Sequence, residues 1–159
     1  MGRDKVPWPQ DTRRYYQEIY NECLRVEAML ETCLAENELD NPWLFELLLP
    51  KVAMRVRHVC QAASKMILFA PQGQGRLPKW FHIVNQIVRI SQIIIEALDS
   101  SEMARCVREN RFVEVARDAK SIIQASQYIR KALTSVPMEY SKIVMTVSGF
   151  REVVINDKR

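Results

Sequence analysis

Residues 78–98 read PKWFHIVNQIVRISQIIIEAL, and this stretch decides the fold class. Its polar side chains recur at helical intervals and its length exceeds that of a usual strand, so its isoleucines do not indicate a β-strand. Two apolar sides run along the predicted helix, one from Trp80 to Ile94 and one from Phe81 to Leu98. A helix that is apolar over so much of its circumference must contact several neighbours. The stretch therefore predicts a buried helix in an all-α domain.

Two similar repeats precede this helix. In residues 12–37, apolar side chains from Tyr16 to Cys33 recur at spacings of three and four, as they do on one side of an amphipathic helix. A second repeat begins after Pro42, a residue that suits a first helical turn. Pro50 lies inside this second repeat and predicts either a kink or a short helix at 42–49 followed by a longer one.

One more helix is predicted after residue 98. Asp99 and Glu102 have the spacing of a capping box, and apolar residues then recur from Phe112 to Leu133 until Pro137 stops the helix. Four long amphipathic helices joined by short connections predict an up-and-down four-helix bundle over residues 12–136. This all-α bundle is the predicted fold.

The segments on either side of the bundle differ from it. Residues 1–11 form a polar N-terminal extension, and residues 137–159 form a C-terminal tail rich in β-branched side chains. In the tail, runs at 142–147 and 150–155 could pair as a β-hairpin through Ser148 and Gly149. The alternatives are an extended tail or a helix over 138–147.

Composition limits the class of protein. At 159 residues the chain is long enough for one domain with its own core. The sequence has neither an uncharged run of membrane-spanning length nor an N-terminal signal peptide, so we expect a cytoplasmic protein without a membrane partner. The four cysteines include no Cys-x-x-Cys pair, which favours buried free thiols and predicts no metal and no other cofactor.

Charge is distributed unevenly along the chain. Residues 1–50 contain five basic and ten acidic side chains, whereas residues 51–159 contain eighteen basic and nine acidic ones. This polarity could attract an anionic partner, or it could draw acidic and basic helices together within one chain or between subunits.

Basic side chains gather beside the apolar repeats of two predicted helices. A cationic surface of this kind binds nucleic-acid phosphates through charge neutralisation and counterion release. The alternative, which we favour, is a solvated helix face that is partly salt-bridged. The candidate residues are Lys51, Arg55, His58, Lys65, Arg105, Arg108, Arg111, Arg117, Lys120 and Lys131.

Residues 69–82, FAPQGQGRLPKWFH, could form either an active site or a hinge between two helices. Arg76 and His82 have a spacing that is similar to the Arg-x(4–6)-His signature of the HEPN family of helical-bundle ribonucleases. The resemblance implies that the arginine holds a scissile phosphate while the histidine moves a proton. It covers these two residues, and Leu77 stands where that family commonly has a small polar residue. The alternative is an interhelical loop with both side chains in water.

These observations favour a non-catalytic helical-bundle interaction module, an adaptor or a subunit of a larger assembly. Its partner would be another protein or a second copy of the chain, with self-association possible through the second apolar side of residues 78–98. The alternatives are a nucleic-acid-binding accessory subunit, with RNA or DNA as the partner, and a HEPN-like ribonuclease.

Overall fold

A computed structural model describes residues 8–71, 73 and 75–134 of the 159-residue chain. These residues are mainly helical and contain no strand, which confirms the predicted all-α class. The predicted tail at 137–159, with its possible hairpin, and most of the N-terminal extension at 1–11 lie outside the described residues. None of the described helices is both long enough and apolar enough to cross a membrane.

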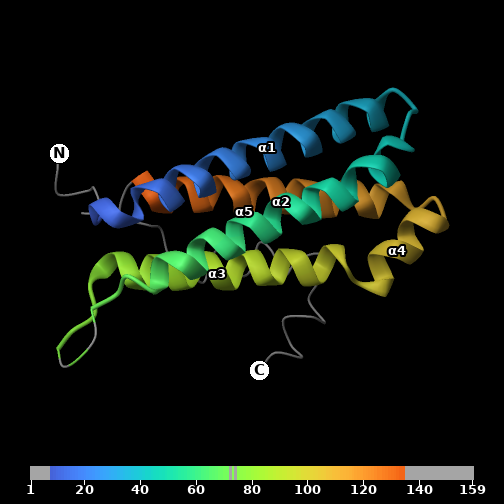
Figure 1. Ribbon diagram of the computed structural model, residues 1–159. Coiled ribbons are helices and arrows are strands. Elements are labelled where there is room, and N and C mark those ends of the chain that lie inside the picture. Colours follow the sequence, from blue (N-terminus) through green and yellow to red (C-terminus); the bar gives the residue numbers. More distant parts are fainter. Residues whose placement is uncertain (1–7, 72, 74, 135–159) are drawn as a thin grey trace.

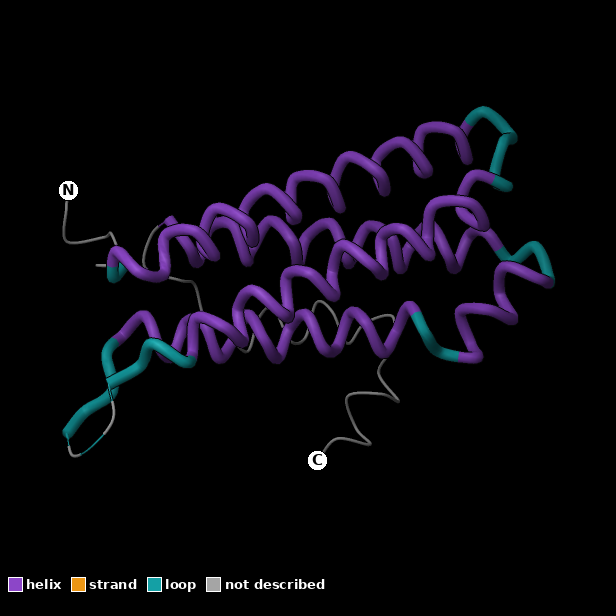
Figure 2. Tube along the Cα trace, viewed as in Figure 1, coloured by secondary structure: helices purple, strands orange, loops and turns teal. Residues whose placement is uncertain are grey.

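Five α-helices follow a short 3-10 turn, Gln10–Thr12. They are α1 (Arg13–Glu38), α2 (Leu44–Ile67), α3 (Lys79–Leu98), α4 (Ser101–Arg108) and α5 (Phe112–Thr134). Figure 2 shows that loops join them directly, the most extended being the one between α2 and α3. The second helix continues through Pro50, so the break predicted as one of two outcomes at this proline does not occur.

The single helix predicted after residue 98 is divided into α4 and α5. Asn110 follows the end of α4 in a left-handed conformation with φ 59°. The amide of Arg111 then donates to the carbonyl oxygen of Cys106 at 2.8 Å, as in a Schellman motif. The start of α4 also differs from the prediction, because the hydroxyl of Ser100, and not Asp99, accepts the amide of Met103 at 3.1 Å.

The four long helices are arranged as a ring in the order α1, α2, α3 and α5, and successive members run in opposite directions (Figure 1). The second helix packs extensively on α1 and α3, while α5 packs mainly on α1 and only sparsely on α3. The short α4 joins α3 to α5 at one end of the molecule. Consequently α2 and α5 are diagonally opposed, and their solvent-facing sides point in different directions.

The core is formed by the apolar repeats that the sequence predicts. The first predicted side of α3 is buried in full, at Trp80, Ile83, Ile87, Ile90 and Ile94. The repeats of α1, α2 and α5 join it in one cluster of buried side chains. Removing one large aliphatic side chain from water contributes about 1.5–3 kcal/mol before entropy is subtracted, so the packed helices are held mainly by this core.

Two glycines shape the loop between α2 and α3. Gly73 and Gly75 have φ angles of 112° and 119°, in the region that side chains with a Cβ rarely adopt. A Cβ at either position would meet nothing within 4 Å, so backbone conformation and not space requires glycine here. The segment around these glycines is therefore an interhelical turn.

Candidate interaction surface

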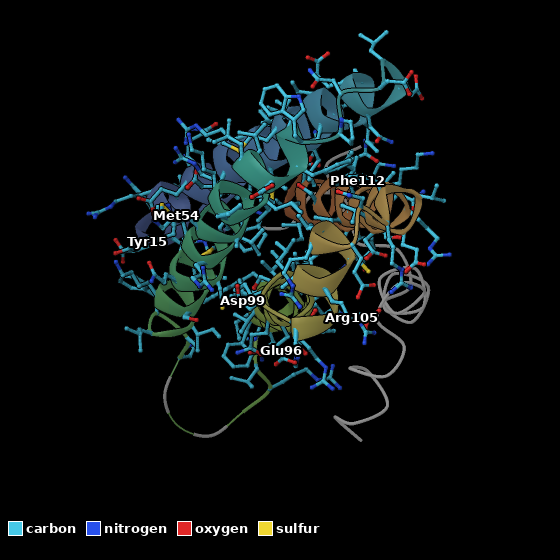
Figure 3. The ribbon with its side chains drawn as sticks, turned by 90° about the vertical axis from the view of Figure 1, so that its right-hand side faces the viewer. Tyr15, Met54, Glu96, Asp99, Arg105 and Phe112 are labelled. Atoms are coloured by element: carbon cyan, nitrogen blue, oxygen red, sulfur yellow. The ribbon has the colours of Figure 1, made fainter. Side chains whose placement is uncertain are left out.

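A row of exposed apolar side chains begins at Trp43, the N-cap residue of α2, and continues along the outer side of that helix. Trp43, Leu47 and Met54 are 59%, 53% and 54% exposed, and Pro50 lies between them. Their spacings of four, three and four residues place them on one side of a helix. Figure 3 shows Met54 on the part of α2 that faces away from the other helices. We call these four residues the outer stripe.

The outer stripe lies opposite the core side of the same helix. Val52, Val56 and Val59 are at most 3% exposed and belong to the buried core. α2 is apolar on two opposite sides, and the fold of its own chain buries only one of them. The outer stripe is therefore an apolar surface that lacks a cover among the described residues.

An apolar groove lies beside the outer stripe. It encloses about 310 Å³ between the first half of α2 and the corner where α3 meets α4. Its apolar lining includes Phe45, Leu49, Pro50, Met103 and Val107. We call it the α2–α4 groove. Because Pro50 belongs to both features, the outer stripe and the groove form one continuous apolar surface.

A group of charged side chains joins α1 to α2. Glu22, whose side chain is 8% exposed, accepts a hydrogen bond from Arg25 at 2.6 Å and lies 2.8 Å from Nδ1 of His58. Arg55 approaches the same carboxylate at 3.4 Å. Burial raises the pKa of Glu22, but the hydrogen bonds from Arg25 and His58 and the charge of Arg55 outweigh it. The pKa of Glu22 therefore lies below its usual value of 4.5.

The group around Glu22 borders an open cavity of about 460 Å³. Its lining includes Glu18, Asn21, Gln61 and Lys65 besides residues of the group itself. The lining mixes both signs of charge with amides, so the cavity is a hydrated notch between two helices. Its lining carries two carboxylates, those of Glu18 and Glu22, but no serine, threonine or cysteine.

A tighter group joins α1 to α5. Arg130 donates two hydrogen bonds to Glu27, at 2.8 and 2.7 Å, in the two-pronged geometry that guanidinium and carboxylate groups favour. Ser126 donates to the same carboxylate at 2.7 Å, and the Arg130 guanidinium lies over the ring of Tyr20. The hydrogen bonds with Glu27 raise the pKa of Arg130 further, so the guanidinium stays charged at every ordinary pH. The group is a structural clamp.

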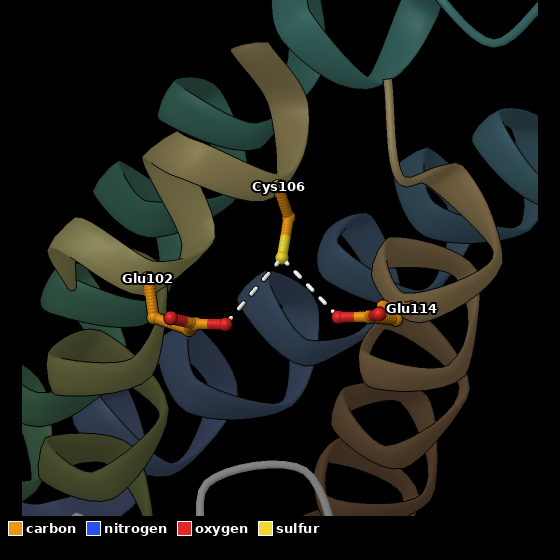
Figure 4. A group of neighbouring side chains, drawn as sticks. All are labelled: Glu102, Cys106 and Glu114. Atoms are coloured by element: carbon orange, nitrogen blue, oxygen red, sulfur yellow. Dashed lines mark hydrogen bonds between the residues drawn. The ribbon is translucent and has the colours of Figure 1, made fainter. Parts of the chain in front are cut away.

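Three potential metal-ligating side chains meet between α4 and α5. Figure 4 shows the thiol of Cys106 between the carboxylates of Glu102 and Glu114, and the three donor atoms lie within 4.8 Å of one another. Arg111 already donates two hydrogen bonds of 2.8 Å to Glu114, and burial raises the pKa of Cys106. One of the two carboxylates in this group is therefore already engaged by a guanidinium.

The predicted basic residues do not form one surface. Arg55 and His58 contact Glu22, Arg105 pairs with Glu102, and Arg111 pairs with Glu114. The remaining candidates are Lys51, Lys65, Arg108, Arg117, Lys120 and Lys131. Those on α2 and those on α5 lie on diagonally opposed helices. Two separate basic faces result.

The two residues of the predicted ribonuclease pair are exposed. Arg76 lies in the loop before α3, and His82 lies on the first turn of α3 with its ring 5.9 Å from that of Phe81. Within the described residues, no hydrogen bond joins Arg76 to His82. Their positions match the interhelical-loop alternative, in which both side chains face water.

Sequence patterns missed two of these features. The outer stripe could have been found, because Leu47 and Met54 repeat at helical spacing beside Trp43. The clamp could not, because Glu27 and Arg130 are 103 residues apart and neither belongs to a local motif.

Comparisons with known proteins add no assignment to this geometry. No family model, no curated protein and no solved structure matches this chain.

Proposed function

We propose that this chain is a non-catalytic interaction module, an adaptor or a subunit of a larger assembly. Its scaffold in this proposal is an up-and-down four-helix bundle of α1, α2, α3 and α5, with α4 as a short connection at one corner. The outer stripe and the α2–α4 groove are its binding surface.

The observation that supports this function is the exposure of the outer stripe. Tryptophan and methionine are enriched at the centres of protein interfaces, where their burial excludes water. Trp43 and Met54 are both more than half exposed on one face of a helix that is already anchored by its other face. Such a rigid apolar row beside a groove fits the mode in which one helix recognises another.

Capture of partners from the native source tests the proposal. The bait is the tagged full-length chain, compared with Met54→Glu and with Leu24→Glu. Leu24 is 43% exposed on α1 and serves as the matched control for placing a carboxylate on an exposed apolar position. We expect a defined protein to co-purify with the unchanged chain and with Leu24→Glu, and to be depleted about tenfold or more by Met54→Glu.

The same experiment can reject the function. If no protein distinguishes Met54→Glu from Leu24→Glu, the outer stripe is not a binding surface. Circular dichroism of each variant shows whether the helices are retained, which we expect because both positions lie at the surface.

Nucleic-acid binding is a second candidate, and surface charge is the observation in its favour. Lys51, Arg108 and Lys120 are exposed and form no ion pair within the described part of the chain. Two opposed basic faces support only weak binding that declines steeply with salt. Gel shifts at low and moderate salt test it, since the double variant Arg117→Glu with Lys120→Glu reduces such binding.

For the ribonuclease alternative, loss of RNA cleavage in His82→Ala is the decisive result.

A further inference from the structure

We propose that the outer stripe is the contact surface of a two-fold symmetric dimer of this chain, in which two α2 helices lie antiparallel. The inference rests on the proposed function, because it names a second copy as the partner that the outer stripe binds. It differs from the self-association predicted through residues 78–98, because it uses α2 and not α3. On the second apolar side of α3, the half-buried residues pack against the core of their own chain; they are Phe81, Val88, Ile95 and Leu98.

The spacing of the outer stripe suits a two-fold axis. The intervals of four, three and four residues are the same when they are counted from either end. Two antiparallel helices therefore place one stripe directly over its copy, with Trp43 level with Met54 and Leu47 level with Pro50. A two-fold interface requires a surface that is complementary to itself in this way.

Charge favours a second copy over an unrelated apolar helix. Between residues 38 and 50 there are three acidic side chains and no basic one, whereas between residues 51 and 65 there are four lysines and arginines and no acidic one. The change of sign falls at Pro50 and Lys51, inside the outer stripe. An antiparallel copy sets the acidic end of each α2 against the basic part of the other, while a parallel copy sets like charges together.

The acidic end has charge available for such a contact. Glu38, Asp40 and Glu46 are exposed and form no ion pair among the described residues. In the basic part, Arg57 is paired with Asp99, but that pair is itself exposed, and Lys51 adds an exposed charge. Electrostatic complementarity of this kind fixes orientation more than it adds affinity.

The α2–α4 groove lies next to the proposed axis. Because the groove shares Pro50 with the outer stripe and has a volume of about 310 Å³, it is placed to receive an apolar side chain from the second copy. One helix pair still buries less than the roughly 800 Å² per partner of a standard interface. We therefore expect a dimer that forms reversibly in the micromolar range.

Sedimentation equilibrium of the full-length chain tests the dimer over roughly 5 to 500 μM, a range that brackets a micromolar contact. We expect the weight-average mass to rise with concentration from that of the 18.6 kDa chain towards twice that value. Met54→Glu raises the dissociation constant about tenfold or more, and Leu24→Glu leaves it unchanged.

A charge-swap experiment tests the antiparallel arrangement. Glu38→Lys with Glu46→Lys makes both ends of the surface basic, and Lys51→Glu with Arg57→Glu makes both ends acidic. We expect each double variant to dimerise more weakly than the unchanged chain, and an equimolar mixture to recover association because opposite charges then meet. Raising the salt concentration should abolish the difference between the mixture and its components.

The outcomes separate this inference from the proposed function. A chain that stays monomeric at the highest concentration, dimerises equally well as Met54→Glu, or shows no recovery in the mixture overturns the dimer. If such a chain still captures another protein in a manner that Met54→Glu abolishes, the interaction module stands and only the identity of the partner was wrong. If neither a second copy nor another protein binds through the outer stripe, both proposals fail.

Discussion

Two carboxylates of α1 join this helix to its neighbours, Glu27 to α5 and Glu22 to α2. The surroundings of the two carboxylates differ. Towards α5, Glu27 is held by a two-pronged Arg130 and by Ser126, in a contact that solvent hardly reaches. Towards α2, Glu22 is shared among Arg25, Arg55 and His58 at the edge of a hydrated notch. Both carboxylates are nearly buried. They differ in the number of side chains that contact each one and in the geometry of the hydrogen bonds.

The difference separates a structural contact from an adjustable one. A buried pair with complete hydrogen bonding leaves an unpaired charge when one member is removed, and this is strongly destabilising. A carboxylate that is contacted by three side chains still has two partners when one is lost. The α1–α5 contact should therefore tolerate substitution poorly, and the α1–α2 contact should tolerate it well.

The largest expected effect is that of Arg130→Met. Methionine keeps most of the apolar stem but leaves the Glu27 carboxylate buried with Ser126 as its remaining donor. We expect the free energy of unfolding to fall by about 3 kcal/mol, as measured by urea denaturation at neutral pH. The double variant Arg130→Met with Glu27→Leu should recover a large part of that loss, because no charge is then left unpaired. A loss below about 1 kcal/mol in the single variant would show that water reaches Glu27.

A smaller effect is expected from Glu22→Gln, about 1 kcal/mol at neutral pH. The sharper test is the pH dependence of stability. The pKa of Glu22 in the folded chain lies below its usual 4.5, so its contribution is present above that value and is lost as pH falls through the lowered pKa. The free energy of unfolding of the unchanged chain should therefore fall more steeply below pH 4.5 than that of Glu22→Gln. Parallel curves would contradict this role.

The reactivity of the native cysteines tests how tightly α1 packs against its neighbours, and it requires no substitution. Burial raises the pKa of Cys23 to about 12 and that of Cys33 to about 11, and both thiols are at most 2% exposed. Cys60 on α2 is partly exposed. With an aromatic disulfide reagent at pH 8, we expect Cys60 to react first and the buried thiols to react only on unfolding. Prompt modification of Cys23 would mean that the α1–α5 contact opens readily.

The helices could be predicted from sequence because their signals are local. The repeats that end in the buried Cys33, Met66 and Ile94 depend on spacings of three and four, and a helix converts such spacings directly into a packed side. The division between α4 and α5 had a local signal too. Asn110 is one of the residues that end helices in a left-handed conformation, but the continuing apolar pattern concealed it.

The charged contacts could not be predicted for the opposite reason. Glu22 and Glu27 lie beside the apolar repeat of α1, where the pattern indicates a solvated position, yet both are at most 6% exposed. Their burial depends on Arg55 and Arg130, which are distant in sequence and are brought near only when the helices pack together. Periodicity identifies which side of a helix faces the core. The contacts of the residues beside that side depend on which helices pack next to it.

The smallest expected effect is that of Arg57→Met, which repeats the Arg130 substitution at an exposed pair. Arg57 contacts Asp99 across α2 and the end of α3, and their side chains are 45% and 47% exposed. Because water screens such a pair and both side chains lose rotamer freedom in forming it, we expect a change of at most about 0.5 kcal/mol in the free energy of unfolding. The two arginine-to-methionine variants thus differ in burial and not in chemistry. Urea denaturation of both variants under one set of conditions isolates the effect of burial. Equal losses in the free energy of unfolding would show that a buried ion pair and an exposed one contribute equally to this fold.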